Sequence, residues 1–145
     1  MTDGCTGQLQ KSDTRGNFCT GAWFAYINAD DPDHRRIRQF FDQYSGRLIT
    51  TNYIFDETVT LTLARLGHRK SVLVGRTLLE PEVVEMIHIA PSDEKVAWNL
   101  FEKRADKAYR FTDCTSFIVM HRLKLGIAVA LDNHFLQEGF QVRPG

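Results

Sequence analysis

Short apolar runs alternate along this chain with longer segments of helical periodicity, and the alternation limits the folds that it can adopt. The clearest run is 127–131, five apolar residues in a row, as expected of a strand buried on both faces. Further short strands are predicted at 17–20, 47–50, 83–89 and 140–142. Strands that alternate with helices form a mainly parallel sheet covered on both faces. The sequence therefore predicts an α/β fold of three layers, α/β/α, around a short, mainly parallel central sheet.

Helices are predicted between these strands at 22–27, 34–44, 53–66, 69–79, from 92 onward and at 113–124. Two of them have an apolar face that is expected to point inward: Ile54, Leu61 and Ala64 in the third, and Val96, Ala97, Leu100 and Phe101 in the fifth. Helix starts are expected at residues whose side chains can cap, namely Asp33, Thr51 or Asn52, and Ser92. Gly67 is expected to end the third helix.

The 145 residues fit one domain. Residues 1–15 are polar and without periodicity, so we expect a disordered tail there and a single domain over 16–145. The net charge is zero, so the chain lacks a global field that would attract nucleic acid, and any RNA contact must come from a local patch.

The three cysteines, Cys5, Cys19 and Cys114, form no CxxC pair, which argues against a disulfide framework and a zinc site. No apolar run approaches the roughly 18 residues of a membrane span, and the first residues lack the apolar core of a signal peptide. A cytoplasmic protein without membrane contact is expected.

Three acidic residues lie where chemistry is expected in an α/β fold. Asp132 directly follows the buried strand, at the edge of the sheet where ligands bind. Asp113 opens a helix, and Glu57 borders the apolar face of another. Each alone has an ordinary structural explanation, as a turn acid, a helix-dipole partner or a boundary residue. Together they would repel one another without a cation, and carboxylate ligands suit Mg²⁺ or Mn²⁺.

Segments 50–57, 110–117 and 130–135 resemble the second, third and fourth acidic motifs of VapC-type PIN domains, and 20–34 resembles the opening of that family. The resemblance covers nearly all of 16–142. It implies a PIN-like fold in which Glu57, Asp113 and Asp132 bind Mg²⁺ or Mn²⁺ and are catalytic. It also implies that Thr20 and Thr115 hydrogen-bond the waters of the metal or a ligand.

By the same resemblance the chain is expected to be an endoribonuclease, the toxin of a type II toxin–antitoxin pair. Metal-bound water would attack the RNA phosphodiester. A homodimer and a cognate antitoxin, whose tail occupies the acidic cleft, are the implied protein partners. Arg110, beside Asp113, is the candidate RNA-phosphate contact, and His134 is interpreted as a packing or helix-capping residue. The alternatives are a catalytically impaired RNA- or protein-binding module, and a PIN ribonuclease outside a toxin–antitoxin pair.

Cys19 is the one departure from the family pattern. The first acid of the family lies directly before the segment that matches 20–23, and here that position is Cys19. A soft thiolate is a poor ligand for Mg²⁺. Asp13 cannot easily substitute, because six extended residues span ~20 Å. Three interpretations stay open: a weakened but working site, a protein that acts by binding, or a cysteine introduced in place of the natural residue.

Overall fold

Residues 15–144 are described here from a computed structural model. The expected disordered tail at 1–15 therefore lies outside the described residues except for Arg15, and so does Asp13. No helix within the described range is long and apolar enough to cross a membrane.

Twelve elements follow one another along the described chain. They are β1 (Gly16–Phe18), α2 (Thr20–Ile27), α3 (His34–Gln43), β2 (Leu48–Thr51), α4 (Asn52–Leu66), α5 (His68–Leu79), β3 (Val84–Ile87), α6 (Pro91–Lys103), α7 (Phe111–Arg122), β4 (Ile127–Val129), α8 (His134–Gln137) and β5 (Gln141–Arg143).

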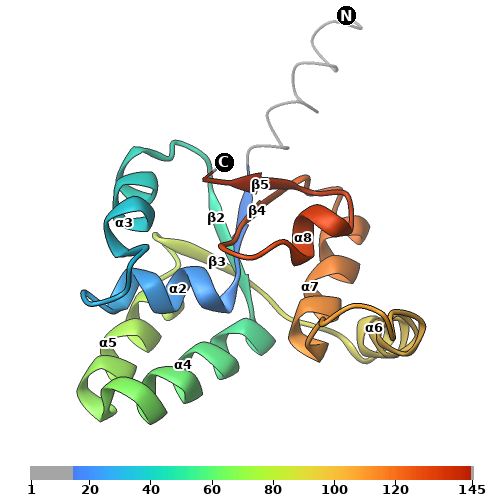
Figure 1. The fold of residues 1–145 in the computed structure, drawn as a ribbon, viewed down its shortest axis with the longest axis horizontal. Coiled ribbons are helices and arrows are strands. Elements are labelled where there is room, and N and C mark those ends of the chain that lie inside the picture. The colour runs from blue at the N-terminus through green and yellow to red at the C-terminus, as the bar shows by residue number, and fades with distance from the viewer. Residues whose placement is uncertain (1–14, 145) are drawn as a thin grey trace, which may run out of the picture.

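All five strands are parallel and lie in the order β3-β2-β1-β4-β5. Helices α2 to α5 lie to one side of the sheet and α6 to α8 to the other (Figure 1). The predicted α/β/α layers and the parallel sheet are thus confirmed. Because the chain leaves β1 toward β2 and returns at β4 on the other side, the strand order reverses beside β1, where ligands bind in such sheets.

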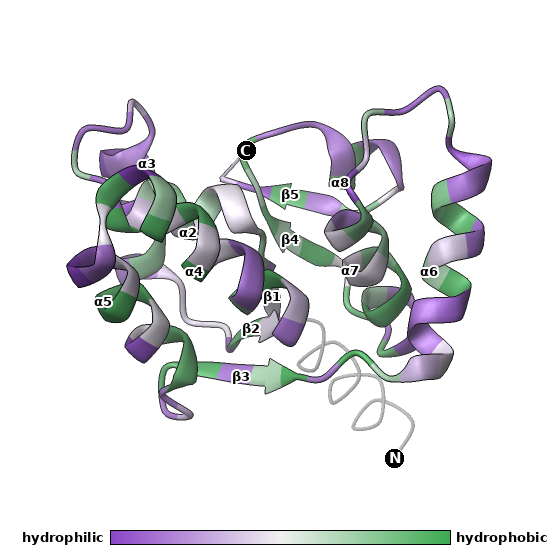
Figure 2. Ribbon diagram, turned by 90° about the horizontal axis from the view of Figure 1, so that it is seen from below, coloured by the Kyte–Doolittle hydropathy of each residue, from purple (hydrophilic) through white to green (hydrophobic). Residues whose placement is uncertain are grey.

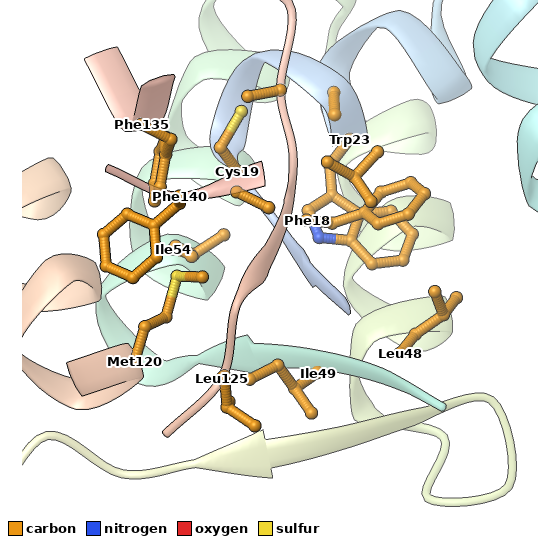
Figure 3. Packing of buried hydrophobic residues seen from close by; sticks show 14 of the residues in the cluster. Phe18, Cys19, Trp23, Leu48, Ile49, Ile54, Met120, Leu125, Phe135 and Phe140 are labelled. Carbon is orange, nitrogen blue, oxygen red and sulfur yellow. The ribbon is translucent and has the colours of Figure 1, made fainter. Parts of the chain in front are cut away.

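The core is built around β1 and the helices that contact it. Phe18 and Trp23 are fully buried, with ring centroids 4.6 Å apart. On the other side of the sheet Met120 and Phe135 are buried against β4 (Figure 3). Coloured by hydropathy, β4 is apolar (Figure 2), and the buried residues of α7 include Phe117, Val119 and Met120. Burial of this apolar surface on both sides of the sheet is the main source of stability.

The predicted inner face of α4 is only partly right. Ile54 is buried, but Leu61 is half-buried and Ala64 is exposed. Besides Ile54, the buried residues of α4 are Thr58 and Thr62. They lie four residues apart, and Thr62 Oγ1 donates to the Thr58 carbonyl at 2.7 Å, so its polar atom is satisfied within the helix. Helix α4 contacts α2 and α5, and its buried positions follow the spacing 54, 58 and 62, not the apolar residues Leu61 and Ala64.

Helix α6 also differs from its prediction. Val96 and Phe101 were expected inside but are 49% and 36% exposed. Ser92 does not cap the helix, because it lies within the first turn and the cap comes from Asp93, which accepts a hydrogen bond from the Ala90 N–H at 3.0 Å. The helix packs mainly on α7, so a single narrow face is covered.

The ends of several other helices and strands differ from their predicted positions by one to three residues. The Thr51 hydroxyl accepts from the Ile54 N–H at 3.1 Å and caps α4, as one of two predicted alternatives, while the side chain of Asp33 makes no cap on α3. The predicted strand 17–20 ends at Phe18, because Thr20 begins α2, and the predicted strand 127–131 is ordered as β4 only to Val129. Gly67 has φ +91°, which favours glycine, and it ends α4 as predicted.

Candidate active site

The candidate site lies at the carboxyl ends of β1 and β4, where the strand order reverses. The Cys19 N–H, one residue beyond β1, donates to the Val129 carbonyl at 3.0 Å, which ties the two strand ends together. Asp132 follows β4 by three residues. The parallel pairing therefore brings the position of the first expected acid and the last acid to the same edge of the sheet.

Asp113 is the third residue of α7 and the most buried of the three candidate acids, with 6% of its surface exposed. Its Oδ2 accepts a hydrogen bond from the Arg110 N–H at 3.0 Å, so the carboxylate also closes the first turn of the helix. Burial raises the pKa of Asp113 above its ordinary value, against the opposing effects of this backbone hydrogen bond and of His134. A buried carboxylate of raised pKa at a sheet edge is typical of a functional site.

His134 joins Asp113 to Asp132. Its Nδ1 lies 3.0 Å from Asp113 Oδ2 and 3.6 Å from Asp132 Oδ2. The ring also packs on Tyr109, with centroids 5.3 Å apart, so the predicted packing role is confirmed. The contacts with both acids were missed, although the two-residue separation of Asp132 and His134 placed them on one turn. We call Asp113 and Asp132 the acidic pair.

Glu57 has different partners. Its Oε1 lies 3.2 Å from the Arg110 guanidinium, and its Oε2 accepts from the Thr112 hydroxyl at 3.4 Å. Within the described chain Oε1 accepts no hydrogen bond of good geometry, so the Arg110 contact is an ion pair. Glu57, Arg110 and Thr112 line a pocket of about 440 Å³ between α4 and the start of α7. Thr112 was not foreseen as a partner.

Cys19 is buried in the hydrophobic core, close to Phe18 and Trp23 in sequence and in the cluster that Figure 3 shows. Burial raises the pKa of its thiol to about 12, and the negative charges of Asp132 and Asp113 act in the same direction, while a hydrogen bond from the Ala22 backbone lowers it. The thiol is therefore neutral near pH 7. It contributes no charge where the family pattern has a carboxylate.

The two threonines that the resemblance assigns to the site differ. Thr20 opens α2 directly after Cys19, and its buried Oγ1 has no hydrogen-bond partner among residues 15–144. That oxygen is available to a ligand. Thr115 Oγ1 instead donates to the Thr112 carbonyl at 2.7 Å, so its proton is used within α7.

A hard divalent ion suits the oxygen donors of the three acids in chemistry. Their arrangement does not form a ready centre: across residues 15–144, no three His, Cys, Asp or Glu side chains are grouped closely enough to hold a metal ion. Glu57 pairs with Arg110, and the acidic pair contacts His134. The donor chemistry therefore suits a hard ion, and an ion that binds competes with Arg110 and His134 for these acids.

Comparison with known proteins agrees with this fold. Residues 20–140 match the PIN domain family. The chain is 33% identical over 126 residues to the 23S rRNA-specific endonuclease VapC20 of Mycobacterium tuberculosis, covering 86% of this chain and 95% of that protein. It is 29% identical over 121 residues to a VapC ribonuclease of Archaeoglobus fulgidus, covering 80% and 76% respectively.

The crystal structure of Mycobacterium tuberculosis VapC20, described as a sarcin–ricin loop cleaving toxin, superposes with a TM-score of 0.82 at 31% identity. The superposition covers 86% of this chain and 95% of that one. Family match, sequence relatives and fold therefore agree over the same part of the chain, which includes all three candidate acids. The chain belongs to the PIN domain family.

Proposed function

We propose that this chain is an endoribonuclease and the toxin of a toxin–antitoxin pair. The convergence of Asp113 and Asp132 on one histidine, at the sheet edge where strand order reverses, is the observation that carries the proposal. The relatives named as a 23S rRNA-specific endonuclease and a VapC ribonuclease support the reaction class.

In this proposal Glu57, Asp113 and Asp132 are the catalytic acids. Mg²⁺ or Mn²⁺ is the cofactor that the resemblance implies, and such an ion supplies hydroxide and neutralises phosphate charge when bound. The Arg110 side chain is 57% exposed, so its guanidinium can turn from Glu57 to an RNA phosphate at the pocket mouth. Thr20 Oγ1 is the unpartnered oxygen that a bound ligand would satisfy.

The substrate we propose is an RNA loop, by analogy with the relative described as cleaving the sarcin–ricin loop. The phosphates of a loop can approach an open pocket from outside, whereas a continuous duplex presents a stiffer surface. The cytoplasm, where ribosomal RNA is available, is the proposed location.

A cognate antitoxin and a second copy of the chain are the proposed protein partners. The exposed apolar side chains of α6, Val96 and Trp98, at 49% and 51% exposure, support a surface that another chain covers. Light scattering on the purified chain tests the homodimer, and a monomer at all concentrations would contradict it.

Incubation of the purified chain with an RNA that contains the sarcin–ricin loop tests the activity. We expect discrete cleavage that EDTA stops and that Asp113→Asn or Asp132→Asn reduces by about 100-fold or more. The matched control is Asp42→Asn, which removes an exposed acid of α3. Cleavage that survives both EDTA and Asp113→Asn would contradict the mechanism.

The alternative is a binding module without catalysis, and Cys19 is the observation that favours it. Its expected result is RNA binding without cleavage in the natural chain. Activity that appears only in Cys19→Asp would support this alternative, since it would show an intact scaffold that lacks one charge. A toxin role further requires a small antitoxin reading frame beside the gene, and its absence favours a ribonuclease outside such a pair.

A further inference from the structure

The three acids of the candidate site already have partners within the protein. Arg110 bridges two of them: its guanidinium pairs with Glu57 at 3.2 Å, and its backbone N–H donates to Asp113 at 3.0 Å. Because a guanidinium is charged at all ordinary pH values, it competes for Glu57 whatever the pH. A divalent ion at Glu57 has to compete with this cation.

The geometry around Asp113 is also restricted. One oxygen, Oδ2, accepts both the Arg110 N–H and the contact with His134 Nδ1, so it is committed on two sides. The side chain is 8% exposed, and α7 holds its start fixed. The second carboxylate of the pair, Asp132, is half-exposed and its Oδ1 accepts from the His134 N–H at 3.1 Å. An ion that ligates these carboxylates therefore competes with His134, which lies beside Oδ2 of both.

The remaining position of the cluster holds sulfur. Cys19 is fixed at the end of β1 by its backbone bond to Val129, and it is 7% exposed. A carboxylate there would add a negative charge and a hard oxygen beside the acidic pair, and cysteine adds neither. Competition from Arg110 and the missing charge at Cys19 both lower the affinity for Mg²⁺ or Mn²⁺.

We infer that the free chain binds a hard divalent ion only weakly, and that Arg110 and Cys19 are the two residues that cause this. The inference rests on the proposed function insofar as it takes Glu57, Asp113 and Asp132 as the acids of the site. It concerns ion binding in the absence of RNA and predicts which substitutions strengthen it.

Mn²⁺ titrations of the purified full chain, followed by calorimetry and by the electron paramagnetic resonance signal of free Mn²⁺, test the inference. Cys19→Asp is expected to raise the Mn²⁺ affinity by about 10- to 100-fold. Cys19→Asn, which offers an oxygen without the charge, is expected to raise the affinity much less than Cys19→Asp does. Wild-type affinity equal to that of Cys19→Asp would overturn the inference, and so would an equal gain in Cys19→Asn.

Arg110→Ala gives a second test on an exposed position, where the fold is not at risk. It is expected to raise the Mn²⁺ affinity by about 5-fold or more, because Glu57 loses its competing cation. Arg65→Ala is the matched control, since it removes an exposed positive charge about two turns beyond Glu57 on α4. Equal gains from Arg110→Ala and Arg65→Ala would mean a change in overall charge and would remove Arg110 from the inference.

The RNA-cleavage assay keeps the two proposals separate. A Cys19→Asp variant that binds Mn²⁺ tightly but cleaves no RNA supports the inference and contradicts the proposed function. A natural chain that cleaves RNA and also binds Mn²⁺ as tightly as Cys19→Asp does supports the proposed function and contradicts the inference. Far-UV circular dichroism of each variant checks the fold, and the Arg110→Ala result decides the inference if Cys19→Asp does not fold.

Discussion

Asp93 and Asp113 occupy the same position in two neighbouring helices, yet they have opposite electrostatic surroundings. Each is the third residue of its helix, α6 or α7, and each accepts a hydrogen bond at 3.0 Å from the backbone N–H three residues before it. Both are buried. The local sequence and backbone are therefore nearly equivalent, and any difference must come from the side chains that contact the two carboxylates.

Those partners differ in charge and in geometry. Arg122, at the end of α7, donates two hydrogen bonds of 3.0 Å to the two oxygens of Asp93. Burial alone would raise the pKa of Asp93, but the Ala90 N–H and Arg122 hold it below its ordinary value. Asp113 has His134 in place of an arginine fork, and burial prevails, so its pKa is raised. The Asp93 carboxylate stabilises the packing of α6 on α7 through Arg122. The charged form of Asp113 is instead disfavoured by burial at the candidate site.

The same substitution is expected to destabilise the protein at position 93 but not at position 113. Asp93→Asn should lower the free energy of unfolding by about 2 kcal/mol, less than for a fully buried pair, because Arg122 is 48% exposed and can be hydrated. Asp113→Asn should leave it unchanged or raise it, since the neutral amide suits the buried site. Urea denaturation at pH 7 measures both, and equal losses would mean that the two helix starts are equivalent.

The pH dependence of these differences sharpens the comparison. The pKa of Asp93 is lower in the folded chain, so its contribution is present above the ordinary value of 3.8 and is lost as the pH falls through the folded pKa. The pKa of Asp113 is higher in the folded chain, so protonation favours folding and the advantage of Asp113→Asn at neutral pH closes on acidification.

Denaturation series from pH 7 to pH 3 on the natural chain and both variants measure these trends. The expected changes in the free energy of unfolding with pH are smaller than the effects of the two substitutions at pH 7. Only the contribution that depends on protonation of the carboxylate varies with pH. An advantage of Asp113→Asn that widens on acidification would be inconsistent with a raised pKa.

The comparison also shows what the sequence could predict. The end of the apolar strand at 127–131 located Asp132, and the helix signal located Asp113, because both depend on local patterns. The Glu57–Arg110 pair joins residues 53 positions apart, and no periodicity specifies such a contact. The inner face of α4 was misjudged for a similar reason: Thr58 and Thr62 are the buried residues, but threonine gives no apolar signal, and the packing of α4 on α5 and α2 decides which face is covered.

Ser92 offers the smallest test of the same comparison. Its residue type predicts a helix cap, but Asp93 makes the hydrogen bond to the Ala90 N–H and Ser92 is exposed in the first turn of α6. Ser92→Ala is therefore expected to change the free energy of unfolding by less than about 0.5 kcal/mol, as for an exposed side chain without a structural role. A capping serine would instead cost about 1 kcal/mol. Thr51→Ala, which removes the cap of α4, is the matched positive control in the same denaturation experiment. If Ser92→Ala cost as much as Thr51→Ala, Asp93 would not be the residue that closes α6, and its likeness to Asp113 at the helix start would be lost.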